Sequence, residues 1–229
     1  MSTTQTPIRL AFKIISLSCL ALILISIVMV LPWRWFKPPT SAFMFVDNLT
    51  NDRKVDYVWV SLQNMASCMG IAAVAAEDQK FPDHYGFDLD SIADALKDPD
   101  GRPRGASTIS QQVAKNLFLW NGRSYIRKGI EAWLTVLIET FWPKRRILEI
   151  YLNIAEFGPG VFGVGAASIL LRDVYPLELT SFDCAVLAAV LPNPKTMSAA
   201  EPSAYVQKRA SEIQMQINHL GGASYLDRL

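Results

Sequence analysis

The sequence predicts a mainly α-helical protein, in which one helical domain follows a single N-terminal membrane-spanning helix. Residues 14–33 contain no charged side chain. From about residue 47 onward, apolar residues recur every three or four positions, the spacing of helices that pack through one face. Runs that alternate apolar and polar residues, which are typical of strands, are scarce. A chain of 229 residues is long enough for one domain with a sizeable core and an appendage.

The N-terminal segment IISLSCLALILISIVMVLPW, residues 14–33, has the length of a transmembrane helix. At about 1.5 Å per residue, roughly 20 residues cross a hydrocarbon core about 30 Å thick. A cleaved signal peptide is the alternative, but its apolar region is normally shorter and no small-x-small cleavage site follows this one. We therefore expect an anchor, with a tail at 1–13, a juxtamembrane linker at 34–46 and one domain at 47–229. Basic residues flank both ends of the span, so charge does not settle its orientation.

Helical periods and helix-ending residues divide the domain into a succession of helices. The stretch 37–45 contains two prolines and no helical period, and we expect it to be a linker or juxtamembrane arm. Thr108 and Gln111 have the spacing of a capping box. The expected helices are 63–81, 88–98 with Asp88 or Asp90 as N-cap, 107–120, 124–142, 144–157 after Pro143, 164–175, 181–191 and 203–220.

Charge and cysteine usage exclude some classes of function. The net charge is +1, which gives no argument for a nucleic-acid partner. The three cysteines show no metal-ligand spacing, and Cys19 lies within the apolar span. Cys68 and Cys184 would pair if their domain is exported, but two cysteines with apolar flanks are more often unpaired core residues, which is the outcome we favour.

Two adjacent acids, Glu77 and Asp78, end an apolar run at 71–76. On a helical projection Asp78 continues the apolar stripe, and Glu77 lies about 100° away from it. Acids at a helix C-terminus oppose the helix dipole. Desolvation at an apolar wall raises the pKa of a carboxyl group toward the range of a general acid or base. The alternative is a pair of solvated acids at a helix end. For His84 we expect a structural or hydrogen-bonding role rather than metal ligation.

A basic cluster follows along the chain. Its members within fourteen residues are Lys115, Arg123, Arg127 and Lys128, and Arg102 and Arg104 lie upstream. Glu131 lies at the border of its helix's apolar stripe, four residues after Arg127. A surface salt-bridge cluster would explain this pattern. Cations near two carboxylates also suit a substrate with a phosphate or diphosphate leaving group.

Five stretches, in order over about residues 70–195, resemble the signatures of the peptidoglycan glycosyltransferases (glycosyltransferase family 51). They are EDQKFPDHYGFD, GASTISQQVAKNLFL, RKGIE, KRRILEIYLN and AVLAAVLPNP. The chain contains no Ser-x-x-Lys, so it resembles members without a transpeptidase domain. Asp183-Cys184, at the head of the fifth stretch, departs mildly from the family pattern.

The resemblance implies a lysozyme-like helical domain that polymerises lipid II into β-1,4 glycan strands with inversion, in cell wall biogenesis and the maintenance of cell shape. Glu77 corresponds to the general base and Glu131 to the residue that assists departure of undecaprenyl diphosphate. The expected diphosphate ligands are Lys115, Arg123, Arg127 and Lys128; the expected donor-cleft residues are Ser107, Thr108, Gln111, Gln112 and Asn116; and the expected acceptor-side residues are Asp78, Phe81 and His84. No covalent cofactor is expected, and the sequence leaves open whether a divalent cation (Mg²⁺ or Mn²⁺) takes part.

The resemblance also implies an orientation, because lipid-linked sugars are polymerised outside the cytoplasm. The tail at 1–13 would be cytoplasmic, the anchor would cross the inner membrane once, and the domain would be periplasmic. Lipid II, the growing glycan chain and the membrane are the expected partners, together with cell-division or wall-synthesis proteins. Two alternatives are a murein-cleaving, lysozyme-like hydrolase or lytic transglycosylase, and a non-catalytic membrane-anchored scaffold.

Overall fold

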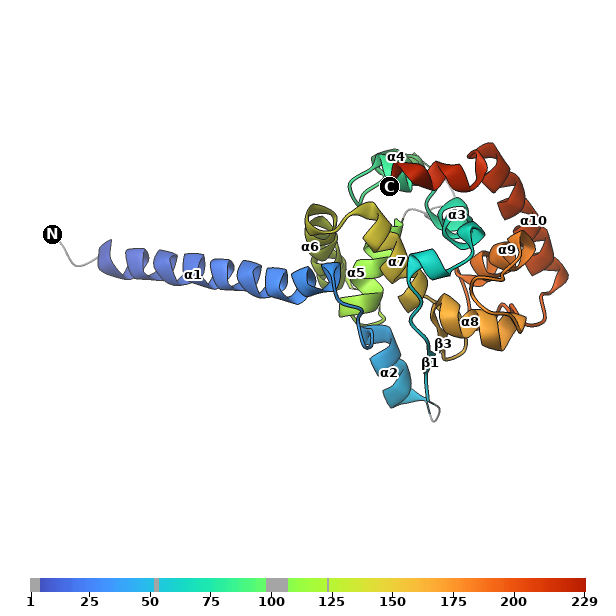
Figure 1. Cartoon of the computed structure of the whole chain (residues 1–229). Coiled ribbons are helices and arrows are strands. Elements are labelled where there is room, and N and C mark those ends of the chain that lie inside the picture. The colour runs from blue at the N-terminus through green and yellow to red at the C-terminus, as the bar shows by residue number, and fades with distance from the viewer. Residues whose placement is uncertain (1–4, 52–53, 98–106, 123) are drawn as a thin grey trace.

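The computed structural model describes residues 5–51, 54–97, 107–122 and 124–229 (Figure 1). Its helices are α1 Gln5–Val30, α2 Ala42–Thr50, α3 Ser67–Glu77, α4 Leu89–Lys97, α5 Ile109–Phe118, α6 Tyr125–Phe141, α7 Lys144–Ile154, α8 Gly163–Arg172, α9 Ser181–Val190 and α10 Ala204–His219. The strands are β1 Asp56–Tyr57, β2 Glu156–Gly158 and β3 Val161–Phe162. Most of the described chain is helical, which confirms the expected mainly α class.

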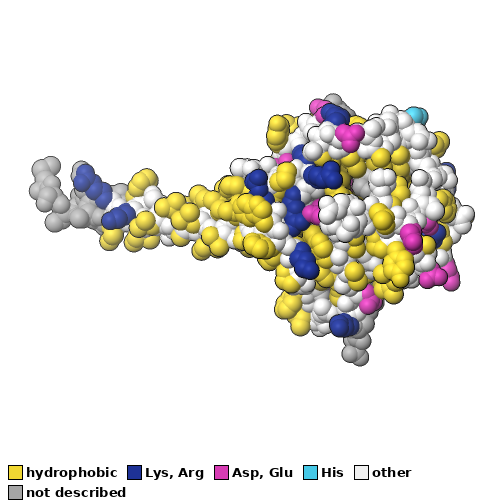
Figure 2. Space-filling view, in the orientation of Figure 1, with side chains coloured by type: hydrophobic (Ala, Val, Ile, Leu, Met, Phe, Trp, Pro, Cys, Tyr) yellow, Lys and Arg dark blue, Asp and Glu magenta, His cyan; other side chains and the backbone are white. Residues whose placement is uncertain are grey.

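Helix α1 extends from the rounded domain as a single rod covered with apolar side chains (Figures 1 and 2). The segment Arg9–Arg34 is long and apolar enough to cross a membrane. Its C-terminal end is tied to the domain where α6 meets α7. The indole Nε1 of Trp142 donates to the carbonyl of Val30 at 3.2 Å, and Arg34 donates to the carbonyl of Phe141 at 2.5 Å. The domain is therefore held at the end of the rod.

The stretch 37–45, expected to be a linker without a helical period, is helical in its second half, where α2 begins. The Ser41 hydroxyl accepts a hydrogen bond from the Met44 N–H at 3.2 Å and so caps the helix. Met44 is 1% exposed, and α2 packs against α5. Tertiary burial of one apolar face thus produces a helix that the local sequence pattern does not indicate.

The expected helix at 63–81 is shorter, because α3 begins at Ser67 and ends at Glu77. A 3₁₀ turn, Leu62–Asn64, precedes it and another, Phe81–Asp83, follows it. Asp78 leaves the helix with φ −160° and ψ 74°, since its carboxylate accepts hydrogen bonds from groups outside α3. The prediction that Asp78 continues the helical stripe is therefore wrong, although its side chain is buried.

Helix α3 forms the centre of the core. Every residue from Met69 to Ala75 is buried, and the helix packs against α9 and α10 (Figure 1). Cys68 of α3 and Cys184 of α9 form a disulfide with Cα atoms 5.9 Å apart. The outcome that we favoured, two unpaired core thiols, is therefore wrong. The two cysteines meet because the helices that carry them lie side by side, a consequence of packing between segments 116 residues apart.

Helix α7 ends at Ile154, three residues before the expected end, and the chain continues into β2. Strand β3 pairs in parallel with β1 and antiparallel with β2. Asn153 joins α7 to the segment that follows β1, because its side chain exchanges two 2.8 Å hydrogen bonds with the backbone of Val60. Gly163 starts α8 with φ +78°, and a Cβ there would lie 2.5 Å from the Asn153 carbonyl oxygen. Only glycine fits this approach.

Candidate active site

Glu77 stands at the C-terminal end of the buried helix α3, at the rim of a cavity. Its Oε2 accepts a hydrogen bond from the Gln112 side-chain amide of α5 at 2.8 Å. Burial raises the pKa of Glu77 above its ordinary value, and the adjacent Asp78 charge acts in the same direction. The hydrogen bond from Gln112 and the positive charges of Arg209 and Lys115 oppose this rise without reversing it. A half-buried carboxyl group with a raised pKa is suited to accept a proton near neutral pH.

Tyr151 of α7 is linked to the Glu77 carboxyl group through the side chain of Gln112. Its hydroxyl donates to Oε1 of Gln112 at 3.5 Å, which fixes the amide so that its nitrogen faces Glu77. The Tyr151 side chain is almost fully buried, and burial raises its pKa well above the ordinary value. The phenol therefore stays protonated and keeps its hydrogen to donate. The two hydrogen bonds that join Tyr151, Gln112 and Glu77 thus connect α7, α5 and α3 at one carboxylate.

Asp78 supports the walls of the site. Its carboxylate accepts hydrogen bonds from Nε2 of His84 at 2.9 and 3.1 Å and from the Ile109 N–H at 2.9 Å. The Gly86 N–H donates to Nδ1 of His84 at 3.1 Å, so the imidazole carries its hydrogen on Nε2. Phe81 is fully buried, with the Lys144 ammonium 4.4 Å from its ring centroid. The hydrogen-bonding role expected for His84 is therefore confirmed.

The start of α5 carries the predicted capping box. The Thr108 hydroxyl accepts from the Gln111 N–H at 3.2 Å, and Oε1 of Gln111 accepts from the Thr108 N–H at 3.0 Å. The Thr108 hydroxyl also donates to the Gly86 carbonyl at 2.7 Å. Both side chains therefore fix the backbone beside the cavity. Their expected contact with a donor sugar stays a prediction, as does that of Ser107.

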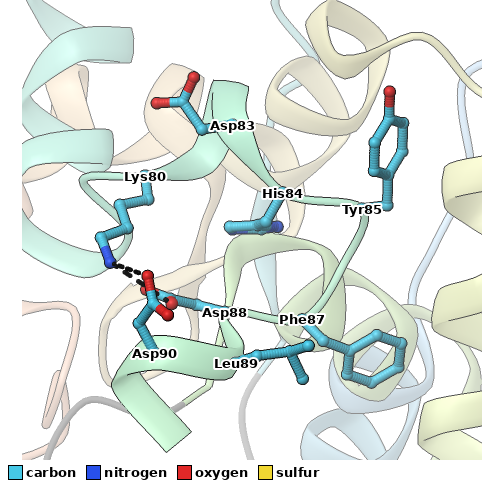
Figure 3. Close-up of a pocket in the computed structure, with 8 residues that line it drawn as sticks. All are labelled: Lys80, Asp83, His84, Tyr85, Phe87, Asp88, Leu89 and Asp90. Carbon is cyan, nitrogen blue, oxygen red and sulfur yellow. Dashed lines mark hydrogen bonds and ion pairs between the residues drawn. The ribbon is translucent and has the colours of Figure 1, made fainter. Parts of the chain in front are cut away.

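The cavity beside Glu77 has a volume of about 270 Å³. Its lining includes Glu77, Asp78, Lys80, Asp88, Ser107 and Thr108. A second pocket of about 480 Å³ adjoins it and shares Lys80 and Asp88 (Figure 3). Figure 3 shows the Lys80 ammonium beside two acids of this second pocket, 2.8 Å from Asp90 and 3.8 Å from Asp88. Asp88 also accepts from the Ser91 N–H, so Asp88 rather than Asp90 caps α4.

The second acid, Glu131 of α6, is only 2% exposed and is paired with two cations. It accepts from Arg127 at 2.8 Å and from Lys128 at 2.5 Å. Lys115 of α5 faces both acids: burial lowers its pKa, while the charges of Glu131 and Glu77 raise it. The structure thus brings together three of the four predicted cations. The fourth, Arg123, lies outside the described residues, as do Arg102 and Arg104.

Two buried polar atoms of this cationic region have no hydrogen-bond partner in the described part of the chain: Asn116 Oδ1 and Arg127 Nε. Unpaired buried donors and acceptors are rare in folded proteins, and each one calls for an explanation such as an ordered water, a bound ion or a ligand. The Arg127 Nε–H is a donor from which an anion can accept, and Lys115 and Lys128 add positive charge, so these three cations form a site that is able to hold an anion. Asn116 Oδ1 is an acceptor, and its expected contact with the donor substrate stays a prediction.

Sequence reasoning gave no role to Tyr151 or Arg209. Tyr151 lies within the fourth motif-like stretch, so its position was an available signal. Arg209 lies on α10, outside all five stretches; α10 packs against α9 and α3, and the charge of Arg209 lowers the pKa of Glu77.

Comparisons with known proteins identify the family of the chain. The family model described as Transglycosylase matches residues 45–218. A protein of Xylella fastidiosa (strain 9a5c), named biosynthetic peptidoglycan transglycosylase, is 51% identical over 216 residues, which cover 91% of this chain and 89% of the relative. Proteins of the same name are similar at 48% identity in Pseudomonas fluorescens Pf-5 (89% of this chain, 88% of the relative) and at 51% in Pseudomonas putida KT2440 (89% of each). The chain belongs to the transglycosylase family.

Proposed function

We propose that the protein is a peptidoglycan glycosyltransferase that polymerises lipid II into β-1,4-linked glycan strands in cell wall synthesis. The name that its relatives share, biosynthetic peptidoglycan transglycosylase, supports the reaction class. The single structural observation that carries the proposal is the arrangement of two acids. Glu77 is a half-buried carboxyl group with a raised pKa, whereas Glu131 is buried and paired with Arg127 and Lys128. The charges of both acids raise the pKa of Lys115.

The reaction proceeds by displacement at C1 of the donor N-acetylmuramic acid. Glu77 takes the proton of the acceptor's 4-hydroxyl group as that oxygen attacks C1. The bond from C1 to the diphosphate oxygen breaks, and its electron pair leaves with undecaprenyl diphosphate. Attack opposite to the leaving group converts the α-linkage to β, and Glu77 then passes its proton to solvent. A positioned general base contributes about 10²–10⁴-fold in rate.

Negative charge develops on the diphosphate as the bond breaks. Lys115, Arg127 and Lys128 supply cations on that side, and the unpaired Arg127 Nε has a hydrogen to donate to a phosphate oxygen. Glu131 holds Arg127 and Lys128 in place, so its contribution to leaving-group departure runs through these two cations.

A hydrolase that cleaves neutral glycosidic bonds has less need of this cation cluster.

The participation of a divalent cation stays a prediction. Among the described residues, no group of three His, Cys, Asp or Glu side chains forms a metal site. Both oxygens of Glu131 already accept from Arg127 and Lys128. We therefore derive no step through a metal.

We further propose that α1 crosses the inner membrane, with residues 1–13 in the cytoplasm and the catalytic domain in the periplasm. The apolar length of α1 supports a single-pass anchor. The disulfide Cys68–Cys184 supports an oxidising compartment for the domain, because such bonds are rare in the cytosol. Cell-division or wall-synthesis proteins as partners remain a prediction.

Turnover of purified lipid II by the full-length protein in detergent tests the function. The wild type should produce a glycan polymer that a muramidase digests, and Glu77→Gln should lose about 10²–10⁴-fold of this rate while keeping its melting temperature. Glu201→Gln, a change at an exposed acid that lines neither pocket, is the matched control and should behave as wild type. Degradation of ready-made murein without polymer formation would favour a hydrolase. Full activity of Glu77→Gln would refute the base assignment.

A further inference from the structure

After α10 the chain turns back toward the site. A 3₁₀ segment, Gly222–Arg228, follows the helix, and Figure 1 shows it in red beside α3, which it contacts. Leu226 packs so closely on α3 that a Cβ added at Gly70 would lie 2.9 Å from its Cδ1. The segment lies beyond residues 45–218, so the family match assigns it no role.

Two side chains of this segment hold the loop 79–84, which directly follows the two acids at the end of α3. The Tyr225 hydroxyl donates to the Gln79 carbonyl at 2.8 Å. Both terminal nitrogens of the Arg228 guanidinium donate to the Asp83 carboxylate. The guanidinium also lies 5.1 Å from the centroid of the Tyr225 ring, so the two side chains support each other. We call Tyr225 and Arg228 the clasp.

The loop that the clasp holds forms part of the wall of both pockets. Gln79 lines the cavity beside Glu77, and Asp83 lines the larger pocket that adjoins it (Figure 3). Neither residue of the clasp lines either pocket. The clasp therefore acts on the pockets through the loop.

As a contact that stabilises the whole fold, the clasp is weak. The Asp83 and Arg228 side chains are 47% and 49% exposed, and ion pairs between exposed side chains contribute little to stability. Buried Phe81 already anchors the middle of the loop in the core. The clasp instead acts on Gln79 and Asp83, which lie on either side of Phe81 and line the pockets. Its contacts are therefore suited to set the position of the pocket wall.

We propose that the clasp is a positioning device for the acceptor: by holding the loop 79–84 it keeps the pocket wall in the conformation that binds the acceptor sugar of lipid II. This rests on the proposed function, because it takes this wall to be the acceptor side. Glu77 and Asp78 have hydrogen-bond partners of their own on α5, Gln112 and the Ile109 N–H. Loss of the clasp should therefore displace the wall and leave the base in place, so that acceptor binding weakens while the chemical step is kept.

The test is steady-state kinetics of the full-length protein in detergent, with a lipid-linked glycan in excess as donor and lipid II varied as acceptor. Tyr225→Phe removes one hydroxyl group, Arg228→Gln removes the charge, and the double variant removes the clasp. If only a fraction of the molecules has the wall in place, the apparent KM rises by the inverse of that fraction. The double variant should raise KM about three- to tenfold, the factor that corresponds to one net hydrogen bond, with kcat within about twofold of wild type.

Lys208→Gln is the matched control, because it removes a charge on α10 from a side chain that is 79% exposed, and it should keep the wild-type KM. A purely structural role of the clasp predicts a lower melting temperature with an unchanged KM in the folded protein. That result, or a loss of kcat at unchanged KM, overturns the inference. Tyr225→Phe keeps the ring in place, so it should raise KM in the same direction even if the double variant does not fold.

The same assay separates this inference from the proposed function. If the wild type makes no polymer from lipid II, the proposed function fails and the role of the clasp fails with it. If the wild type makes polymer and the clasp variants keep its KM, only the role of the clasp is refuted.

Discussion

Replacing Asp78 with alanine removes the acceptor that holds three segments of the chain together beside the cavity. The carboxylate accepts from Nε2 of His84, in the segment after α3, and from the Ile109 N–H at the start of α5. The Asp78 side chain is 3% exposed and that of His84 is 8% exposed. Water is therefore poorly placed to replace the lost oxygen atoms.

The cost follows from the two donors that are left buried. Each unpaired donor costs about 1–3 kcal/mol, so two cost about 2–6 kcal/mol. Whole domains are stable by only about 5–15 kcal/mol. At about 2–4 °C per kcal/mol for a domain of this size, the melting temperature should fall by at least about 4 °C. Asp78→Asn keeps one oxygen in place, so one of the two donors stays paired and about half of the loss is expected.

Thermal unfolding of the purified full-length protein, followed by circular dichroism at 222 nm, measures this effect. Asp90→Ala is the matched control, because Asp90 forms a surface pair with Lys80 and its side chain is 80% exposed. Such pairs contribute about 0–1 kcal/mol. The wild type and Asp90→Ala should have the highest melting temperatures, Asp78→Asn a lower one and Asp78→Ala the lowest. If Asp78→Ala melts with Asp90→Ala, the argument that Asp78 supports the site is refuted.

Two further predictions concern the core. The double variant Cys68→Ala/Cys184→Ala should lose about 2–5 kcal/mol of unfolding free energy and melt at a lower temperature, because the disulfide spans a sequence separation of 116 residues. A melting temperature equal to that of the oxidised wild type would contradict this. Gly165→Ala should lower the denaturant midpoint, since an added Cβ would lie 2.2 Å from the Val58 carbonyl oxygen. Gly129→Ala, where a Cβ meets nothing within 4 Å, is the control, and equal midpoints for the two variants would count against the close approach.

Local sequence patterns indicated most helices of this protein, with α2 as an exception. The capping box at Thr108 and Gln111 fixes the start of α5 through neighbours three residues apart, so it can be read without the fold. The apolar run at 14–33 lies within α1 and the 3₁₀ turn Leu31–Arg34 that follows it. This segment was also predictable, because its length and lack of charge are properties of the local sequence. The motif-like stretches also indicated that Glu77, Lys115 and Glu131 belong to one site, and the charges of both acids raise the pKa of Lys115.

Packing between distant segments decided the remainder. Strands β1 and β3 are two residues long, too short for an alternating pattern, and they form only because the chain brings residues 56–57 and 161–162 together. The disulfide depends in the same way on the contact between α3 and α9.

The sequence by itself determined the helical class, the apolar anchor and the residue types of the site, because these depend on near neighbours along the chain. Only the tertiary structure decided that Asp78 turns away from the helix, that Tyr151 steadies Gln112 and that the charge of Arg209 lowers the pKa of Glu77. The physical reason is that burial and electrostatic attraction depend on distance in space, which separation along the chain does not fix.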